Sequence, residues 1–135
     1  MPVTFEQHMR RLDLIARVSQ SARTRANEAS TAIKRSSYAV LGGKRSGRTY
    51  KIAGTRRRYK ASSPGEAPAS RKRKFRNSWY TKPEGLSPGV ATQDTELAKI
   101  LSKGTKRMKR RPFVRKIQRR SRRSLRQIYR RPYLT

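Results

Sequence analysis

Few side chains in this sequence could carry out acid–base, metal or nucleophilic chemistry. The sequence has one histidine, His8, and no cysteine. Its seven acidic residues are scattered, and no pair has the spacing of a catalytic carboxylate dyad or a metal cage. The glycines at 42 and 43 are not followed by the pattern of a phosphate-binding loop. We therefore predict that the chain is not an enzyme and holds no cofactor or metal.

The chemistry that the sequence does offer is the binding of anions. Lys and Arg number 37 against 7 Asp and Glu, which gives a net charge of +30. Arg outnumbers Lys, and the planar guanidinium can bind phosphate or carboxylate through two parallel hydrogen bonds. We expect three basic clusters to contact a polyanion or an acidic partner: Arg56, Arg57 and Arg58; Arg71, Lys72, Arg73 and Lys74; and Arg115, Lys116, Arg119, Arg120, Arg122, Arg123 and Arg126.

This charge also limits how the chain can fold. A large excess of like charge opposes compaction unless counter-charge is supplied, so the partner is expected to contribute to stability. Hydrophobic residues make up 33% of the sequence and aromatic residues 7%, which allows only a modest core. No run of apolar residues is long enough to cross a membrane, and the N-terminal residues lack the apolar core of a signal peptide. We expect a single domain over residues 1–135.

The clearest element that must position the basic clusters is an N-terminal helix. Thr4 and Gln7 fit a capping box, and the two glycines at 42 and 43 fit a helix end. We predict a helix over roughly residues 5–38, within a segment 1–41, with close packing along its Ala-rich half and with reach toward a neighbouring subunit. One apolar stripe recurs at steps of three and four: Phe5, Met9, Leu12, Ile15, Val18, Ala22, Ala26, Ala29 and Ile33.

The remaining residues predict an α+β domain with a long N-terminal helix, a small antiparallel sheet, a short helix and a basic C-terminal helix. Residues 42–74 are expected to form a basic extended arm with turns, including a loose hairpin. Residues 75–111 are expected to hold strands near 75–82 and 89–93, a short helix at 95–103 and a basic loop. Residues 112–131 then form the basic helix. We expect Trp79 to pack in the core rather than to stack on a base.

Two separated motifs resemble the phage tail-component family, the neck or tail-completion proteins of long-tailed bacteriophages. The first is the turn segment SPGEAPA at residues 63–69, which is similar to the family's SAPGEAPA segment before a strand. The second is GTKRMKRRPF at 104–113, which is similar to the family's pattern before its last helix. The resemblance covers about residues 46–118. The residues that match are Ser63, Pro64, Gly65, Glu66 and Pro68 in the turn, and Gly104, Thr105, Met108, Arg111, Pro112 and Phe113 in the loop.

The resemblance implies a non-enzymatic structural protein at the phage head–tail joint. Such a protein forms a homo-oligomeric ring of six or twelve copies, through which DNA passes. Its partners would be connector or head-closure proteins and tail-tube or tail-terminator proteins, with contact to the DNA backbone and none to a membrane. The protein would be located in the neck of the virion after assembly in the host cytoplasm. The turn at 63–68 would then be an interface loop.

Two other hypotheses stay open at the level of sequence. The first is a general RNA- or DNA-binding protein of ribosomal-protein style, which the charge and the Arg-rich C-terminal helix also fit. Its binding should weaken steeply with salt. The second is a cationic membrane-active helix at residues 113–131, whose apolar stripe is narrow.

Overall fold

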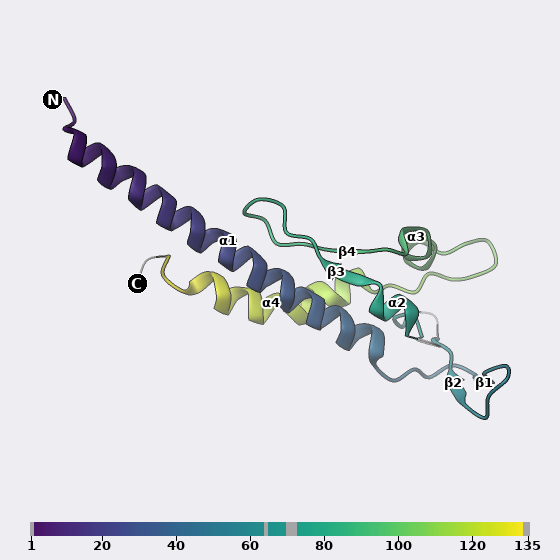
Figure 1. The fold of residues 1–135 in the computed structure, drawn as a ribbon. Coiled ribbons are helices and arrows are strands. Elements are labelled where there is room, and N and C mark those ends of the chain that lie inside the picture. Colours follow the sequence, from purple (N-terminus) through teal and green to yellow (C-terminus); the bar gives the residue numbers. More distant parts are fainter. Residues whose placement is uncertain (1, 64, 70–72, 134–135) are drawn as a thin grey trace.

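The chain folds as the predicted α+β domain, with a long N-terminal helix, a short helix and a basic C-terminal helix (Figure 1). The computed structural model describes residues 2–63, 65–69 and 73–133. The elements in chain order are α1 (Phe5–Gly42), β1 (Thr49–Lys51), β2 (Arg58–Lys60), α2 (Lys74–Asn77), β3 (Trp79–Thr81), β4 (Val90–Thr92), α3 (Thr95–Lys103) and α4 (Val114–Arg130).

The first helix begins with the capping box that the sequence predicted. The Gln7 N–H donates to the Thr4 hydroxyl at 3.2 Å, and the Thr4 N–H donates to the Gln7 side chain at 3.1 Å. The helix continues past residue 38 to Gly42 because two arginines satisfy its last carbonyls. Arg76 donates to the carbonyl of Tyr38 at 3.1 Å, and Arg45 to that of Val40 at 2.7 Å. At 38 residues, α1 is about 57 Å long.

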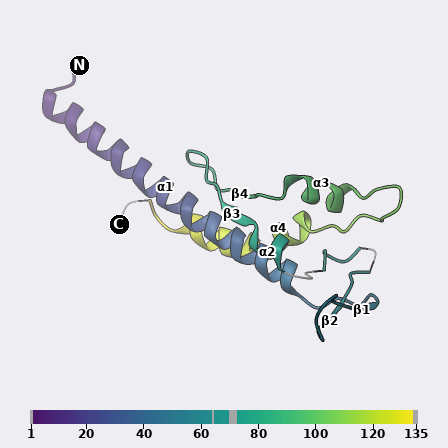
Figure 2. The ribbon, with the colours of Figure 1, turned by 45° about the vertical axis from the view of Figure 1, so that its right-hand side comes forward.

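Helix α4 lies alongside the C-terminal half of α1 and runs in the opposite direction (Figures 1 and 2). The contact uses small side chains. Ala26 and Ala29 of α1 are fully buried, as is Ser30, and Ser121 of α4 is 1% exposed. Small residues let the two backbones approach closely, so the predicted packing along the Ala-rich half of α1 is confirmed. The N-terminal half of α1 extends beyond α4.

The strands form two separate antiparallel sheets rather than the single small sheet that we expected. In one, β1 pairs with β2, and Tyr50 lies opposite Tyr59. In the other, β3 pairs with β4, and Trp79 lies opposite Thr92. The predicted strand near 75–82 is also shorter, because residues 74–77 form the helical turn α2. This turn places the Phe75 ring 5.8 Å from the Trp79 ring, whereas an extended strand would separate these residues by about 13 Å.

The core is small and lies where α1, β3 and the start of α4 meet. Its buried residues include Leu41, Trp79, Phe113 and Ile117. The rings of Phe75, Trp79 and Phe113 pack edge to face, with centroids 5.6–5.8 Å apart. The prediction that Trp79 belongs to the core is therefore confirmed. Partly buried side chains on α1, β4 and α3 surround this cluster, so the core joins these elements to β3 and the start of α4.

Candidate interaction surfaces

The turn at residues 63–68 is closed by one carboxylate. The Glu66 carboxylate accepts the N–H of Ser63 at 2.9 Å and that of Ser46 at 3.2 Å, and also the Ser46 hydroxyl. These bonds, the Ser46 hydroxyl first, lower the pKa of Glu66 to about 2. Gly65 has φ of +86°, which favours glycine. Pro68 is buried, and Pro64 lies outside the described residues.

The loop at residues 104–113 folds back on α3. The N–H of Thr105 donates to the carbonyl of Met108 at 2.8 Å, and the Arg111 N–H donates to the Leu101 carbonyl at 2.7 Å. Gly104 has φ of +77°, and a Cβ there would lie 2.8 Å from the backbone nitrogen of Arg110. Only glycine fits this position. Residue 112 precedes the helix, which begins at Val114, so the predicted start of the last helix was two residues too early.

The two motif segments, which are about forty residues apart in the sequence, lie close together, and hydrogen bonds to residues beside them hold them there. The Arg111 guanidinium donates to the Ser62 hydroxyl at 2.9 Å, and the Lys116 ammonium donates to the Gly65 carbonyl at 2.8 Å. Phe113 of the loop and Ala67 of the turn belong to the same core cluster. The ammonium group of Lys116, which we expected to contact a polyanion, thus holds the turn against α4.

The predicted basic clusters lie in separate places. The hairpin of β1 and β2 carries Arg56, Arg57 and Arg58, all exposed, beyond the C-terminal end of α1 (Figures 1 and 2). Arg73 and Lys74 are exposed at the start of α2, whereas Arg71 and Lys72 lie outside the described residues. The third cluster covers the outer side of α4.

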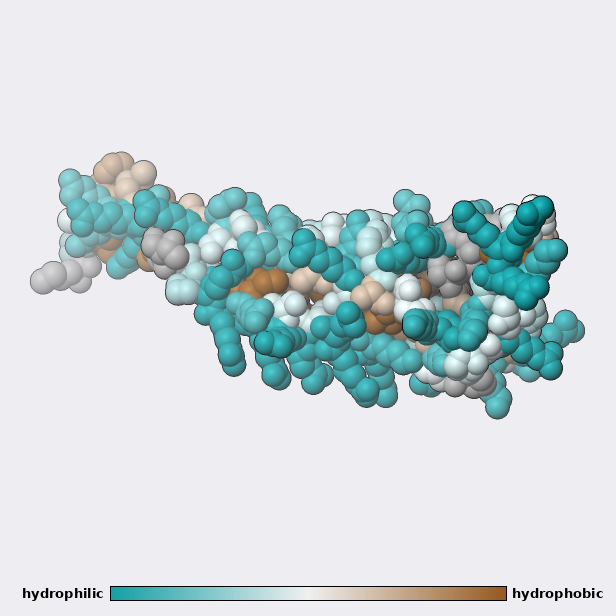
Figure 3. All heavy atoms as spheres, turned by 90° about the horizontal axis from the view of Figure 1, so that it is seen from below, coloured by the Kyte–Doolittle hydropathy of each residue, from teal (hydrophilic) through white to brown (hydrophobic). Residues whose placement is uncertain are grey.

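The third cluster is the largest basic surface. Among the residues that the structure describes, its arginines form no ion pair. The view from below shows that this side of the molecule is largely hydrophilic, with long side chains that project from its middle part (Figure 3). Such a surface can bind an anionic partner without first breaking internal ion pairs. Its exposed residues are Arg115, Arg119, Arg120, Arg122, Arg123 and Arg126.

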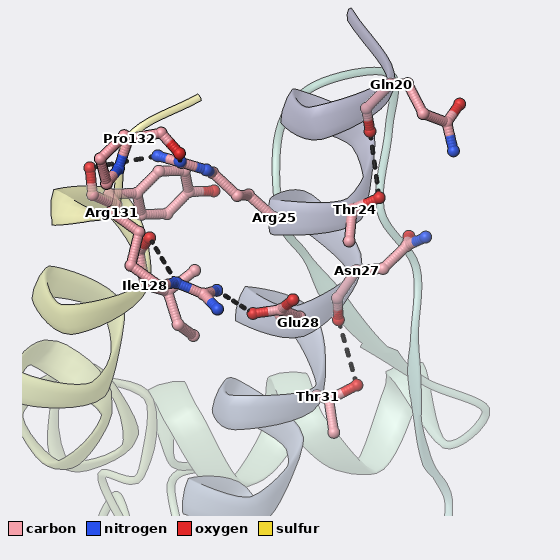
Figure 4. Close-up of polar contacts among 10 residues, drawn as sticks. Gln20, Thr24, Arg25, Asn27, Glu28, Thr31, Ile128, Arg131 and Pro132 are labelled. Carbon is pink, nitrogen blue, oxygen red and sulfur yellow. Dashed lines mark hydrogen bonds and ion pairs between the residues drawn. The ribbon is translucent and has the colours of Figure 1, made fainter. Parts of the chain in front are cut away.

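A groove beside the α1–α4 contact contains basic residues that the sequence analysis missed. Its walls include Arg35 of α1 and Arg131, which follows α4. Glu28 forms an ion pair with Arg131 across the groove (Figure 4). One signal in the sequence could have indicated this face, because polar residues at 24, 28, 31 and 35 recur at helical spacing.

Arg25, which was not predicted from the sequence as a contact residue, joins α1 to the end of α4. It is 4% exposed, and its guanidinium donates to the carbonyls of Tyr129, at 3.4 Å, and Pro132 (Figure 4). It also lies over the Tyr133 ring, 3.9 Å from the centroid. Burial raises the pKa of Tyr129. Because helix C-terminal carbonyls carry partial negative charge, this buried cation stabilises the end of α4.

The apolar stripe of α1 is only half covered. Its C-terminal part packs in the body, but its N-terminal part is exposed, with Phe5 at 79%, Met9 at 48%, Leu12 at 47%, Ile15 at 61% and Val18 at 37%. Figure 3 likewise shows apolar atoms at the end that carries the N terminus. Exposed apolar stripes of this kind mark interaction surfaces. His8, which lies beside the stripe, is also exposed.

Within the described ranges, no group of three or more His, Cys, Asp or Glu residues could hold a metal ion. No helix in the same ranges is both long and apolar enough to cross a membrane. Comparisons with protein-family models, curated proteins and solved structures find no match for this chain. The likeness to tail-component proteins therefore rests on the two motifs alone.

Proposed function

We propose that this chain is a non-enzymatic structural subunit of the phage head–tail joint, and that copies assemble through the exposed half of the α1 stripe. The observation that carries this proposal is the row of five large apolar side chains, 37–79% exposed, on a helix that extends beyond the body. Burial of apolar surface against a partner is favourable by about 25 cal/mol per Å². In this assembly each copy supplies a helix that the next copy covers.

Charge favours a second copy as the occupant of the stripe. Around it, Glu6 and Asp13 nearly balance Arg10, Arg11 and Arg17, and Asp13 pairs with Arg17 at 3.0 Å. The rest of the chain is strongly basic, so copies repel one another at most other surfaces. The exposed half of α1 is therefore the surface at which two copies can approach with the least electrostatic cost.

The contact between the two motif segments also supports this proposal. The segments that resemble the tail-component family lie close together: Arg111 of the loop binds Ser62, which precedes the turn, and Lys116, which follows the loop, binds Gly65 of the turn. A rigid turn of this kind suits an interface loop toward connector, head-closure or tail proteins. The exposed arginines of α4 then contact acidic neighbours or the DNA that crosses the ring. In this proposal the protein is located in the neck of the virion.

A charge on the stripe tests the assembly. Leu12→Lys places an ammonium on the stripe, whereas Leu14→Lys makes the same change two residues away, on the opposite side of the helix. The two leucines are 47% and 49% exposed, so they form a matched pair. We expect the wild type and Leu14→Lys to sediment as oligomers of six or twelve copies and Leu12→Lys as a monomer. A monomeric wild type, or equal loss in both variants, would overturn the proposal.

One observation favours a second function. The exposed arginines of α4 lack acidic partners among the described residues, which also suits a general RNA- or DNA-binding protein of ribosomal-protein style. The two functions differ in assembly. Tight, salt-sensitive binding of RNA by a chain that remains monomeric would favour the second one.

A further inference from the structure

The groove beside the α1–α4 contact is unusual in its chemistry. It has a volume of about 1020 Å³, at the upper end of the range of small-molecule pockets, yet most of the residues that line it are of polar types. Pockets for small molecules are usually lined by apolar and aromatic side chains. The residues that line this groove are Thr24, Asn27, Glu28, Thr31, Ala32, Arg35, Ser36 and Ala39 of α1, and Arg120, Ser124, Gln127, Ile128 and Arg131 from α4 and its end.

The charge of the groove favours an anionic ligand. Three guanidinium groups line it against one carboxylate, and that carboxylate, on Glu28, is already paired with Arg131. Arg35 and Arg120 approach from opposite helices, and neither side chain forms a hydrogen bond or an ion pair within the described part of the chain. Two uncompensated cations therefore border one groove.

Uncharged hydrogen-bond donors on α4 accompany the guanidinium groups in the groove. The hydroxyls of Thr24 and Thr31 donate to carbonyls of their own helix, at 3.0 Å each. Figure 4 shows the Asn27 amide turned away from α4. Ser124 and Gln127 form no side-chain hydrogen bond with the described residues, so a hydroxyl and an amide accompany the guanidinium groups. These are the groups that contact phosphate oxygens in protein–nucleic acid complexes.

We propose that this groove binds the phosphodiester backbone of a nucleic acid strand. Among the described residues that line it there is no aromatic side chain, so the groove has no platform of aromatic rings for bases, and we expect binding that depends little on sequence. Arg123, which is exposed three residues after Arg120 on α4, extends the basic path along the helix. Duplex DNA, single-stranded DNA and RNA share this backbone chemistry. The site is built within one chain, so it goes beyond the proposed assembly and does not depend on it.

Removal of the two free cations tests the site. Fluorescence anisotropy with labelled 20-nucleotide duplex DNA, single-stranded DNA and RNA measures affinity over a range of salt. The double variant Arg35→Gln/Arg120→Gln should bind at least about tenfold more weakly, and the slope of log K against log salt on duplex DNA should become shallower by about 1.8. Arg10→Gln/Arg11→Gln removes the same charge on the projecting half of α1 and should leave the slope unchanged. The nucleic acid that binds most tightly of the three is the type of strand that the groove recognises.

A gain of binding provides a second test. Glu28→Gln removes the only carboxylate of the groove and frees Arg131, so it should tighten binding roughly threefold to fivefold. Glu6→Gln changes the net charge equally but lies outside the groove, and should have no such effect. Equal effects of the paired variants would show that only net charge matters and would overturn the proposal. Competition by polyglutamate as strong as that by DNA would overturn it as well.

The assembly through α1 and the phosphodiester site in the groove can be disproved separately. If Leu12→Lys is monomeric but still binds DNA with the wild-type salt slope, both proposals hold. If the wild type is monomeric and the groove variants lose binding, the assembly is wrong and the groove stands. If the groove variants bind as the wild type does while the wild type forms oligomers, the groove is wrong and the assembly stands.

Discussion

Glu66 shows how one residue can organise a loop in a very basic protein. Its carboxylate accepts hydrogen bonds from Ser46 and Ser63, and it lies in the electrostatic field of Arg45. Burial is the main cause that lowers the pKa of Arg45, and Glu66 opposes that shift. Arg45 in turn donates to the carbonyl of Pro68, at 3.0 and 3.2 Å. Glu66 thus joins the turn to Ser46, and Arg45 joins it to the end of α1, because Arg45 also donates to the Val40 carbonyl.

This arrangement predicts a specific acid sensitivity. The pKa of Glu66 is about 2 in the folded chain against an ordinary value of 4.5, so the ionised form favours folding. Its contribution to stability is complete above about pH 4.5 and is lost as the pH falls toward about 2. Thermal unfolding of the wild type and Glu66→Gln should therefore differ at pH 6 and converge near pH 2. Glu84→Gln, an exposed control, should follow the wild type at every pH; a Glu66→Gln curve parallel to the wild type would contradict the prediction.

For single residues, the sequence predicted which types of side chain are buried better than it predicted which residues they contact. The large aromatic side chain of Trp79 indicated a core residue, and Trp79 is buried in the core. In contrast, nothing in the sequence distinguishes Lys116 or Arg25 from the other basic residues. Their roles depend on which surface α4 presents to the turn and to α1, and that is decided by packing between distant segments.

The antiparallel pair of α1 and α4 is the main structural unit at the scale of elements. Buried alanines and serines allow close approach, and Gly89 of the β3–β4 connection donates its N–H to the Ser30 hydroxyl at 2.9 Å. Arg25 fixes the far end of the pair. Because a buried cation cannot be left unpaired without a large cost, its bonds to the end of α4 are structural.

We expect Arg25→Met to destabilise the chain by about 2 kcal/mol, because the hydrogen bonds to the carbonyls of Tyr129 and Pro132 are lost while the side-chain length is kept. Hydrogen exchange should show that the amides of the last turn of α4 lose protection first. Arg23→Met is the matched control, since Arg23 is exposed on the same helix. Equal denaturation midpoints for the two variants would mean that the buried guanidinium is not needed.

Periodicity predicted the long helix, the short helix α3 and the last helix, but it missed the four-residue helix α2 and the division of the strands into two sheets. The stripe of α1 indicated which face is apolar, but not that only its C-terminal half is covered, because coverage depends on where α4 ends. The helical turn at 74–77 could not be separated from a strand, since four residues carry too little pattern. Contacts of Phe75 with Trp79 and Phe113 decide its conformation. The sequence likewise predicted one sheet instead of two, because strands of three residues carry too little pattern to show which strands pair.

At the scale of the whole molecule, repulsion between like charges acts against the stability that the small core provides. The net charge is +30, and the ion pairs among the described residues are few: Arg17–Asp13, Lys99–Glu96 and Arg131–Glu28. All three are exposed, and exposed pairs contribute little. Repulsion among the uncompensated arginines is therefore the larger electrostatic effect, and anions in solution should reduce it.

Salt should consequently stabilise the isolated chain. Raising NaCl from about 0.05 M to about 0.5 M shortens the screening length about threefold. The unfolding temperature should therefore rise by several degrees. The triple variant Arg119→Gln/Arg122→Gln/Arg126→Gln removes part of the repulsion on α4. It should unfold at a higher temperature than the wild type in low salt and should respond less to added salt. An unfolding temperature that falls with NaCl would mean that ion pairs dominate instead.

The edge-to-face packing of Trp79 has a practical consequence. The chain contains one tryptophan, and its neighbours Phe75 and Phe113 belong to different segments, α2 and the residue before α4. The tryptophan fluorescence of the protein, excited selectively over that of its six tyrosines, therefore comes from a single site in the body, remote from the projecting end of α1. The emission spectrum reports whether the body is folded, while the anisotropy decay of the same fluorophore reports how large the assembly is. Loss of subunit association can thus be told from unfolding in one cuvette, without any attached dye.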